Sequence, residues 1–161
     1  MKKIICAMLC LVLLCSCSSG GNVKVVNRNL SYKAHIFYFG KEIKLSCVIS
    51  DNGAEYRVVD GQIKDFTVKI NDSGTKVVFE NLEKDIKTKN ESVYSVLYGV
   101  TTYFDKTDYE LKKDDGNYKV DGEISFGKFH YFLTPAGLPL SVEFENGDFS
   151  ADFYDISVEK G

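Results

Sequence analysis

The cysteines are the residues with the most distinctive chemistry, and four of the five lie within the first 17 positions of this 161-residue chain. Cys17 ends the tetrapeptide Leu-Cys-Ser-Cys at positions 14–17. Two lysines at positions 2 and 3 come first, and an uncharged apolar run over residues 4–14 follows them. A charged start, an apolar centre and a small-residue end are the order of a secretory signal. We therefore expect residues 1–16 to be a signal peptide that is removed.

The tetrapeptide at positions 14–17 resembles a lipobox, the cleavage signal of bacterial lipoproteins. The resemblance implies that the Cys17 thiol forms a thioether to diacylglycerol, and that Cys17, bearing acyl chains such as palmitate, becomes the mature N-terminus. Cys15 is a poorer acceptor, because Leu14 would stand before the cut where small residues are wanted. The apolar run is also about half the ~20 residues of a transmembrane helix. Secretion without a lipid remains an alternative, but it leaves Cys17 without a purpose.

These features predict an extracytoplasmic protein that is lipid-anchored to the cell membrane. The anchor would lie in the outer leaflet of the cytoplasmic membrane of a Gram-positive cell, the host that the cysteine-rich signal favours. In a Gram-negative cell, the residue after Cys17 is Ser18 and not Asp, so the anchored protein could also be sorted to the outer membrane. Without the signal, 18 of the 20 basic residues face all 23 acidic ones, a net charge of −5. That charge argues against nucleic acid and against electrostatic binding to anionic lipid, so the acyl chains are the expected membrane contact.

The remaining sequence offers little reactive chemistry, and we expect no enzyme activity, no cofactor and no metal. Cys47 is the one cysteine after Cys17, so an internal disulfide cannot form. Its alternation with Leu45 and Ile49 predicts a buried structural thiol. The two histidines, His35 and His130, lie in strand-like segments, and a metal site needs several converging ligands.

Period-two alternation of apolar residues dominates from position 30 onward and predicts an antiparallel meander of strands. One segment, residues 90–104, instead has apolar residues at helical spacing, with Asn90 or Ser92 as its cap. We expect a tight hairpin centred on residues 127–128 and a bulge near Phe153. Residues 17–29 are polar and contain glycine, which predicts a short lipidated tether before one domain over residues 30–161.

Three stretches carry a resemblance to the LolA/LolB-like lipoprotein-carrier superfamily. They are residues 56–82, the predicted helix near residues 92–104, and residues 131–158, where a strand enters the turn Gly137-Leu138-Pro139 before two further strands. The resemblance implies an α+β, mostly β fold: a curved antiparallel meander sheet, an incomplete barrel, with one helix covering its concave side. Clostridial germination lipoproteins are the small bacterial lipoproteins that we have in mind as relatives, by analogy. Residues 18–30 depart from the family pattern, because they lack its opening helix.

Aromatic residues are abundant, with ten tyrosines, eleven phenylalanines and no tryptophan. They either form a two-sided core beneath the helix or line an apolar concavity for an acyl chain or a peptide. The predicted lining residues of that concavity are Tyr38, Phe66, Tyr94, Leu97, Tyr98, Phe132 and Phe144.

The leading functional hypothesis is a lipid-anchored extracytoplasmic binding module that engages an envelope protein or a lipid. A protein partner is favoured, because a permanently anchored protein cannot carry cargo far. The alternatives are a cell-envelope hydrolase or its accessory subunit, and a structural protein of the envelope or spore layer.

Overall fold

The computed structural model describes residues 23–61, 63–80, 82–86 and 92–159. The first half of the chain contains the strands β1 (Leu30–Tyr38), β2 (Lys41–Ser50), β3 (Gly53–Val58), β4 (Thr67–Asn71), β5 (Gly74–Phe79) and β6 (Leu82–Ile86). The helix α2 (Val93–Lys106) comes next, and then β7 (Lys112–Asp114), β8 (Asn117–Ile124), β9 (Gly127–Leu133), β10 (Pro139–Phe144) and β11 (Phe149–Val158). Cys17 and the predicted signal peptide lie outside the described residues.

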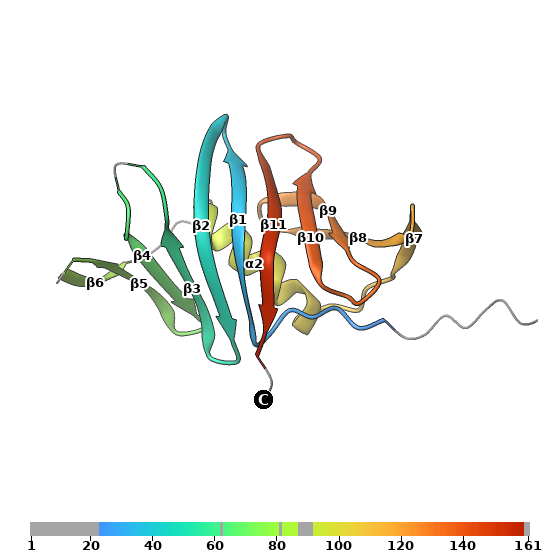
Figure 1. Ribbon diagram of the computed structural model, residues 1–161, viewed down its shortest axis with the longest axis horizontal. Helices are drawn as coiled ribbons and strands as arrows, with labels where there is room; N and C mark the ends of the chain where they lie inside the picture. Colours follow the sequence, from blue (N-terminus) through green and yellow to red (C-terminus); the bar gives the residue numbers. More distant parts are fainter. Residues whose placement is uncertain (1–22, 62, 81, 87–91, 160–161) are drawn as a thin grey trace, which may run out of the picture.

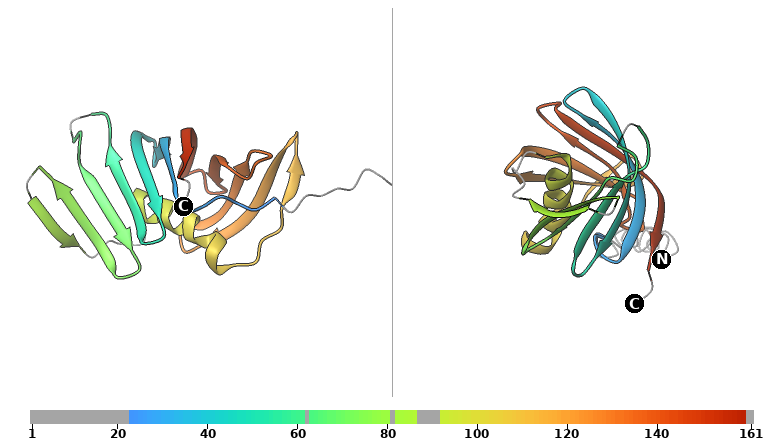
Figure 2. Two further views of the ribbon diagram at one scale, coloured as in Figure 1. Left: turned by 60° about the horizontal axis from the view of Figure 1, so that its bottom comes forward. Right: turned by 90° about the vertical axis from the view of Figure 1, so that its left-hand side faces the viewer.

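The strands form one 11-stranded sheet in the order β6-β5-β4-β3-β2-β1-β11-β10-β9-β8-β7. Each half of the chain is a meander of neighbouring antiparallel strands, and the two meanders join where β1 pairs with β11 (Figure 1). The edge strands β6 and β7 lie at opposite ends of the sheet, so the sheet is curved but unclosed. This architecture confirms the predicted mostly-β fold with one helix on the concave side (Figure 2).

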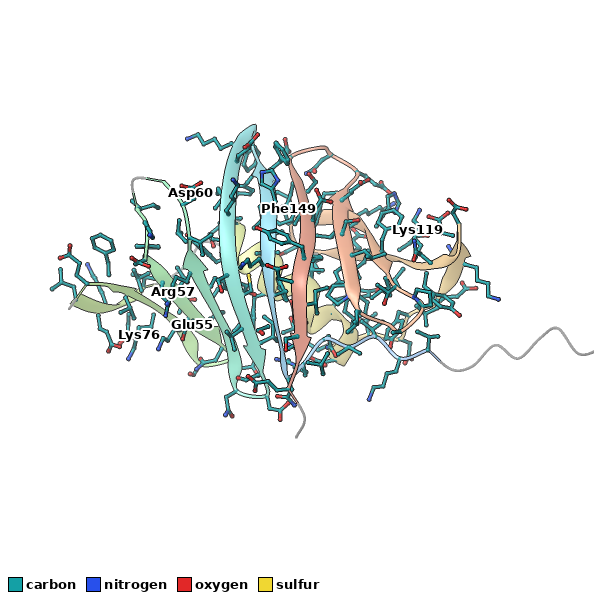
Figure 3. The ribbon with its side chains drawn as sticks, viewed as in Figure 1. Glu55, Arg57, Asp60, Lys76, Lys119 and Phe149 are labelled. Atoms are coloured by element: carbon teal, nitrogen blue, oxygen red, sulfur yellow. The ribbon has the colours of Figure 1, made fainter. Side chains whose placement is uncertain are left out.

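Alternation of buried and exposed side chains gives the sheet an apolar concave face and a polar convex face. In β1, Leu30, Tyr32, Ala34 and Ile36 are buried, whereas Lys33 between them is exposed. Directly paired residues of neighbouring strands point to the same side, so this phase is transmitted across the sheet. Figure 3 views the convex face, where charged residues such as Arg57, Lys76 and Lys119 project.

Helix α2 begins at Val93 because the Ser92 side chain accepts a hydrogen bond from the Ser95 backbone N–H at 3.2 Å. This confirms the predicted helix, with Ser92 as its cap. The buried face of the helix, Val93, Val96, Leu97 and Val100, packs on the sheet. Two threonine hydroxyls in the last turns donate back to main-chain carbonyls, Thr101 to Leu97 and Thr102 to Tyr98, both at 2.9 Å. These bonds satisfy polar groups that would otherwise be buried without a partner.

Two local expectations need adjustment. In the β8–β9 hairpin, Ile124 pairs with Gly127, so residues 125–126 form the turn and not residues 127–128. Phe126 occupies that turn because its ring packs against Phe144, with centroids 5.0 Å apart. The predicted bulge is present, but it lies at Asp155 (φ 51°), two residues beyond Phe153.

Residues 23–29, which we call the strap, are docked on the domain, although the sequence predicts a flexible tether over 17–29. Val25 is buried, and the Val26 N–H donates to the Gly137 carbonyl at 2.9 Å. The Asn27 amide donates to Asp105 Oδ1 at 2.7 Å, and Arg28 Nε donates to Asp105 Oδ2 at 3.1 Å. The strap therefore joins the end of α2 to the β9–β10 turn and has no helix of its own.

We expect Gly137→Ala to detach the strap, because a Cβ at Gly137 (φ +79°) would lie 2.1 Å from the Lys24 carbonyl oxygen. Gly147 is the matched control: it has φ +74°, but a Cβ there would meet nothing within 4 Å. Each substitution should lower the free energy of unfolding by about 1 kcal/mol, because alanine disfavours the left-handed backbone conformation. Gly137→Ala should in addition abolish hydrogen-exchange protection of the Val26 amide. Equal protection of that amide in the two variants would contradict the docking.

Candidate binding surface on the concave face

The middle of the concave face is filled by the protein itself. Helix α2 lies across the hollow of the sheet (Figure 2). Beneath it, Leu45, Tyr56, Val68, Phe129 and Leu133 are at most 1 % exposed. Such complete burial is the packing of a core and leaves little room for a ligand.

Several hydroxyl and thiol groups lie within this core. Tyr32, Cys47, Tyr56 and Tyr131 are all buried, and burial is the main cause that raises the pKa of each of them. Cys47 is free and fully buried, as predicted, and its raised pKa keeps the thiol protonated and inert. The Tyr56 hydroxyl has no hydrogen-bond partner among the described residues.

The seven predicted lining residues do not form one site. Phe66 and Tyr94 lie together, with ring centroids 6.4 Å apart, near the start of α2. Leu97 is buried on the same helix, and the Tyr98 hydroxyl donates to Asp72 at 3.2 Å. These four residues surround the β4–β5 end of the concave face.

The other three predicted residues lie elsewhere. Tyr38 and Phe144 belong to a second aromatic cluster around Phe149, with centroids 6.1 and 5.5 Å from its ring. Phe132 is on the convex face, where the Lys119 ammonium lies 6.0 Å from its ring centroid. The concave placement of Phe132 is therefore corrected, because the phase of β9 turns its neighbour Tyr131 into the core.

Beyond the helix, the concave face continues over β5 and β6 as an exposed apolar surface. Val77 and Phe79 of β5 lie opposite Lys84 and Leu82 of β6. Phe79 is 36 % exposed and Leu82 is 74 % exposed, and the rings of Phe66 and Phe79 are 6.3 Å apart. We call Phe66, Phe79 and Leu82 the apolar shelf. Sequence reasoning named Phe66 but missed Phe79 and Leu82, which pair with each other between β5 and β6.

Four hollows on the surface have none of the seven residues and no shelf residue in their linings. One of about 1040 Å³ and an adjoining one of about 500 Å³ share Lys24, Phe104, Asp105 and Tyr109 of the strap and the end of α2. A third, about 990 Å³, lies over the convex side of β4–β6 and is lined by Lys69, Lys76, Glu83 and Asp85 among others. A fourth, about 260 Å³, lies over residues 48–55 and 69–71.

The convex face carries a charge cluster centred on Asp121. Lys112 Nζ donates to its carboxylate at 2.8 Å, His130 Nδ1 lies 2.8 Å away, and Lys119 Nζ lies 3.2 Å away. The hydrogen bond from Lys112 is the main cause that holds the pKa of Asp121 well below its ordinary value. His130 Nε2 faces a second carboxylate, Glu145, at 4.0 Å. Carboxylates therefore lie at both ring nitrogens of His130, which is part of a polar cluster on the surface.

We expect Asp121→Asn to cost less than about 1 kcal/mol at neutral pH, because the side chain is 40 % exposed and solvent screens its ion pairs. A depressed carboxyl pKa stabilises the fold above the ordinary Asp pKa of about 3.9, and this stabilisation disappears as the pH falls below it. Urea unfolding at neutral pH and at about pH 2 should therefore show the difference from the parent protein shrinking in acid. Glu123→Gln on the same strand is the control, and a difference that grows in acid would contradict the assignment.

No group of three or more His, Cys, Asp or Glu residues that could hold a metal ion occurs in the part of the chain that the structure describes. Within those same residues, no helix has the length and apolar character needed to span a membrane.

Comparison with known proteins finds solved structures with a similar fold. No protein-family model and no curated protein matches the sequence. Among solved structures, a LolA superfamily protein from Nitrosomonas europaea aligns over 86 % of this chain and 90 % of its own, with a TM-score of 0.51 and 6 % identity. An uncharacterized conserved protein from Thermus thermophilus aligns over 84 % of this chain and 82 % of its own, with a TM-score of 0.53 and 10 % identity. The chain therefore has the LolA-like fold.

Proposed function

We propose that this protein is a lipid-anchored, non-catalytic binding module on the outside of the membrane, and that it holds an envelope protein on its apolar shelf. The anchor is supported by the resemblance of residues 14–17 to a lipobox behind an apolar signal. The role in binding is supported by the LolA-like fold. This chain shares that fold with a LolA superfamily protein from Nitrosomonas europaea, and its sequence resembles the lipoprotein carriers of that superfamily.

The shelf is the observation on which the proposal rests. The same concave face is buried under α2 at its centre, yet at β5–β6 it leaves Phe79 36 % and Leu82 74 % exposed. Exposed apolar side chains that lie next to each other are typical of an interaction site. Ile63, in the loop before Phe66, adds a further exposed side chain at 54 %.

A protein partner fits this surface better than a carried lipid. An acyl chain needs an enclosed apolar channel, whereas the core beneath α2 is packed and the shelf is open to solvent on one side. The linings of the four surface hollows described above contain no shelf residue.

The docked strap would hold the domain, though not the shelf itself, close to the membrane, because it leaves the domain on the side of β7 and β8, away from β6 (Figure 1). Five residues lie between Cys17 and Val23, and the six Cα-to-Cα steps that join them span at most about 20 Å when fully extended. An anchored domain of this kind would meet envelope partners at high local concentration, so that a weak contact suffices.

Site-specific photocrosslinking in intact cells tests the proposal. A photoreactive residue at Leu82 should capture one envelope protein, and the same residue at Tyr154, which is 40 % exposed on the convex face, should not. Equal capture from both positions, or none from Leu82, would overturn the proposed function.

A further inference from the structure

Strand β6 is a free edge of the sheet. Among the described strands it pairs only with β5, and it projects beyond the helix at one end of the molecule (Figures 1 and 2). An edge strand directs part of its backbone N–H and C=O groups away from its neighbour, where another strand can bind them. All five residues of β6 are exposed or partly exposed.

The register of β6 separates its side chains into two sets. Leu82, Lys84 and Ile86 lie opposite Phe79, Val77 and Thr75, so they extend the concave face and the shelf. Glu83 and Asp85 point to the convex side, beside the hollow of about 990 Å³. Glu83 accepts a hydrogen bond from Lys76 at 3.3 Å. Among the described residues, Lys84 and Asp85 have no ion pair, and their charges remain available to a partner.

A second copy of this chain does not suit that edge. Consider two β6 strands that pair in antiparallel fashion with Lys84 at the centre, so that the concave faces of the two copies lie on the same side of a continuous sheet. This pairing places Lys84 of one copy opposite Lys84 of the other. It also places Glu83 opposite Asp85 twice. Like charges that lie directly opposite each other destabilise a strand pair. The charged edge thus disfavours this pairing of two copies, as charged edge strands do in other sheet proteins.

We infer that β6 binds an extended segment of a protein partner by strand addition, with a charge pattern complementary to its own. The partner segment carries apolar residues opposite Leu82 and Ile86, an acidic residue opposite Lys84, and basic residues opposite Glu83 and Asp85. Main-chain hydrogen bonds supply affinity, and the alternating side chains supply specificity. The apolar side chains of the segment rest beside the shelf, so this inference builds on the proposed function and names the form of its partner.

Peptide binding to the purified chain tests the inference. The acetylated, amidated peptide Thr-Val-Lys-Glu-Lys-Val-Thr has the complementary pattern, and Thr-Val-Lys-Lys-Lys-Val-Thr differs only at its centre. The parent protein should prefer the Glu-centred peptide about fivefold, and Lys84→Glu should reverse that preference. Lys113→Glu, an exposed lysine on the opposite edge strand β7, is the matched control and should leave the preference unchanged. NMR should show slowed amide exchange in residues 82–86 when peptide is bound.

Three results would overturn strand addition at β6. They are equal binding of the two peptides to every variant, no change at the β6 amides, and protection of those amides by dimerisation without peptide. The crosslinking experiment separates this failure from that of the proposed function. Capture from Leu82 with no peptide preference leaves the binding role intact and removes only the β6 pairing.

Discussion

Leu97→Ala should lower the free energy of unfolding by about 3 kcal/mol, as truncation of a fully buried leucine does when its cavity cannot collapse. Leu97 is 1 % exposed and lies on the face of α2 that packs against the sheet. If α2 fills the concave face as a core element, removal of the Leu97 methyl groups leaves an empty volume between the helix and the strands. Urea unfolding, followed by circular dichroism, measures the change.

Lys106→Ala is the control for Leu97→Ala, because Lys106 is exposed in the last turn of the same helix. It should change the unfolding free energy by no more than about 0.5 kcal/mol. A loss below about 1 kcal/mol for Leu97→Ala would contradict the packed core, since truncation inside a loosely filled cavity costs little.

Cys17→Ala should abolish lipid attachment entirely. Without the thiol no thioether to diacylglycerol can form, so the precursor should keep residues 1–16 and incorporate no fatty acid. Each buried methylene contributes about 0.8 kcal/mol to membrane binding, so loss of the acyl chains removes most of the anchor. Metabolic labelling with a palmitate analogue, read with the size of the product, measures both changes.

Cys15→Ala is the matched control for the anchor, because it removes a neighbouring thiol and leaves the proposed acceptor in place. It should be labelled and processed like the parent protein. Normal labelling of Cys17→Ala would show that the acceptor is another residue.

The fold could be predicted because its strongest signals are local. Alternation in β1 and β2 reports which side chains face the core, and helical spacing in one segment identifies α2. The sequence predicts the β8–β9 turn two residues too far along the chain, because Gly127 is a typical turn residue. The aromatic packing that places Phe126 there is a tertiary contact.

The strap and the shelf escaped prediction for the same reason. Residues 23–29 have the composition of a tether, and they are docked by tertiary contacts, which include those with Asp105 and Gly137 and the burial of Val25. The sequence of β6 is mostly charged, with Ile86 as its one β-branched residue and no aromatic residue, so it is not typical of a strand, although it pairs with β5 along its whole length. Phe132 shows the limit of aromatic counting, because two neighbouring aromatic residues of one strand point to opposite faces.

Native mass spectrometry of the detergent-extracted protein is the most direct test of an anchored module with a filled core. We expect a chain that begins at Cys17, carries covalent acyl groups and holds no further lipid. A chain that retains residues 1–16 without acylation, or one that keeps a stoichiometric non-covalent lipid, would contradict the account.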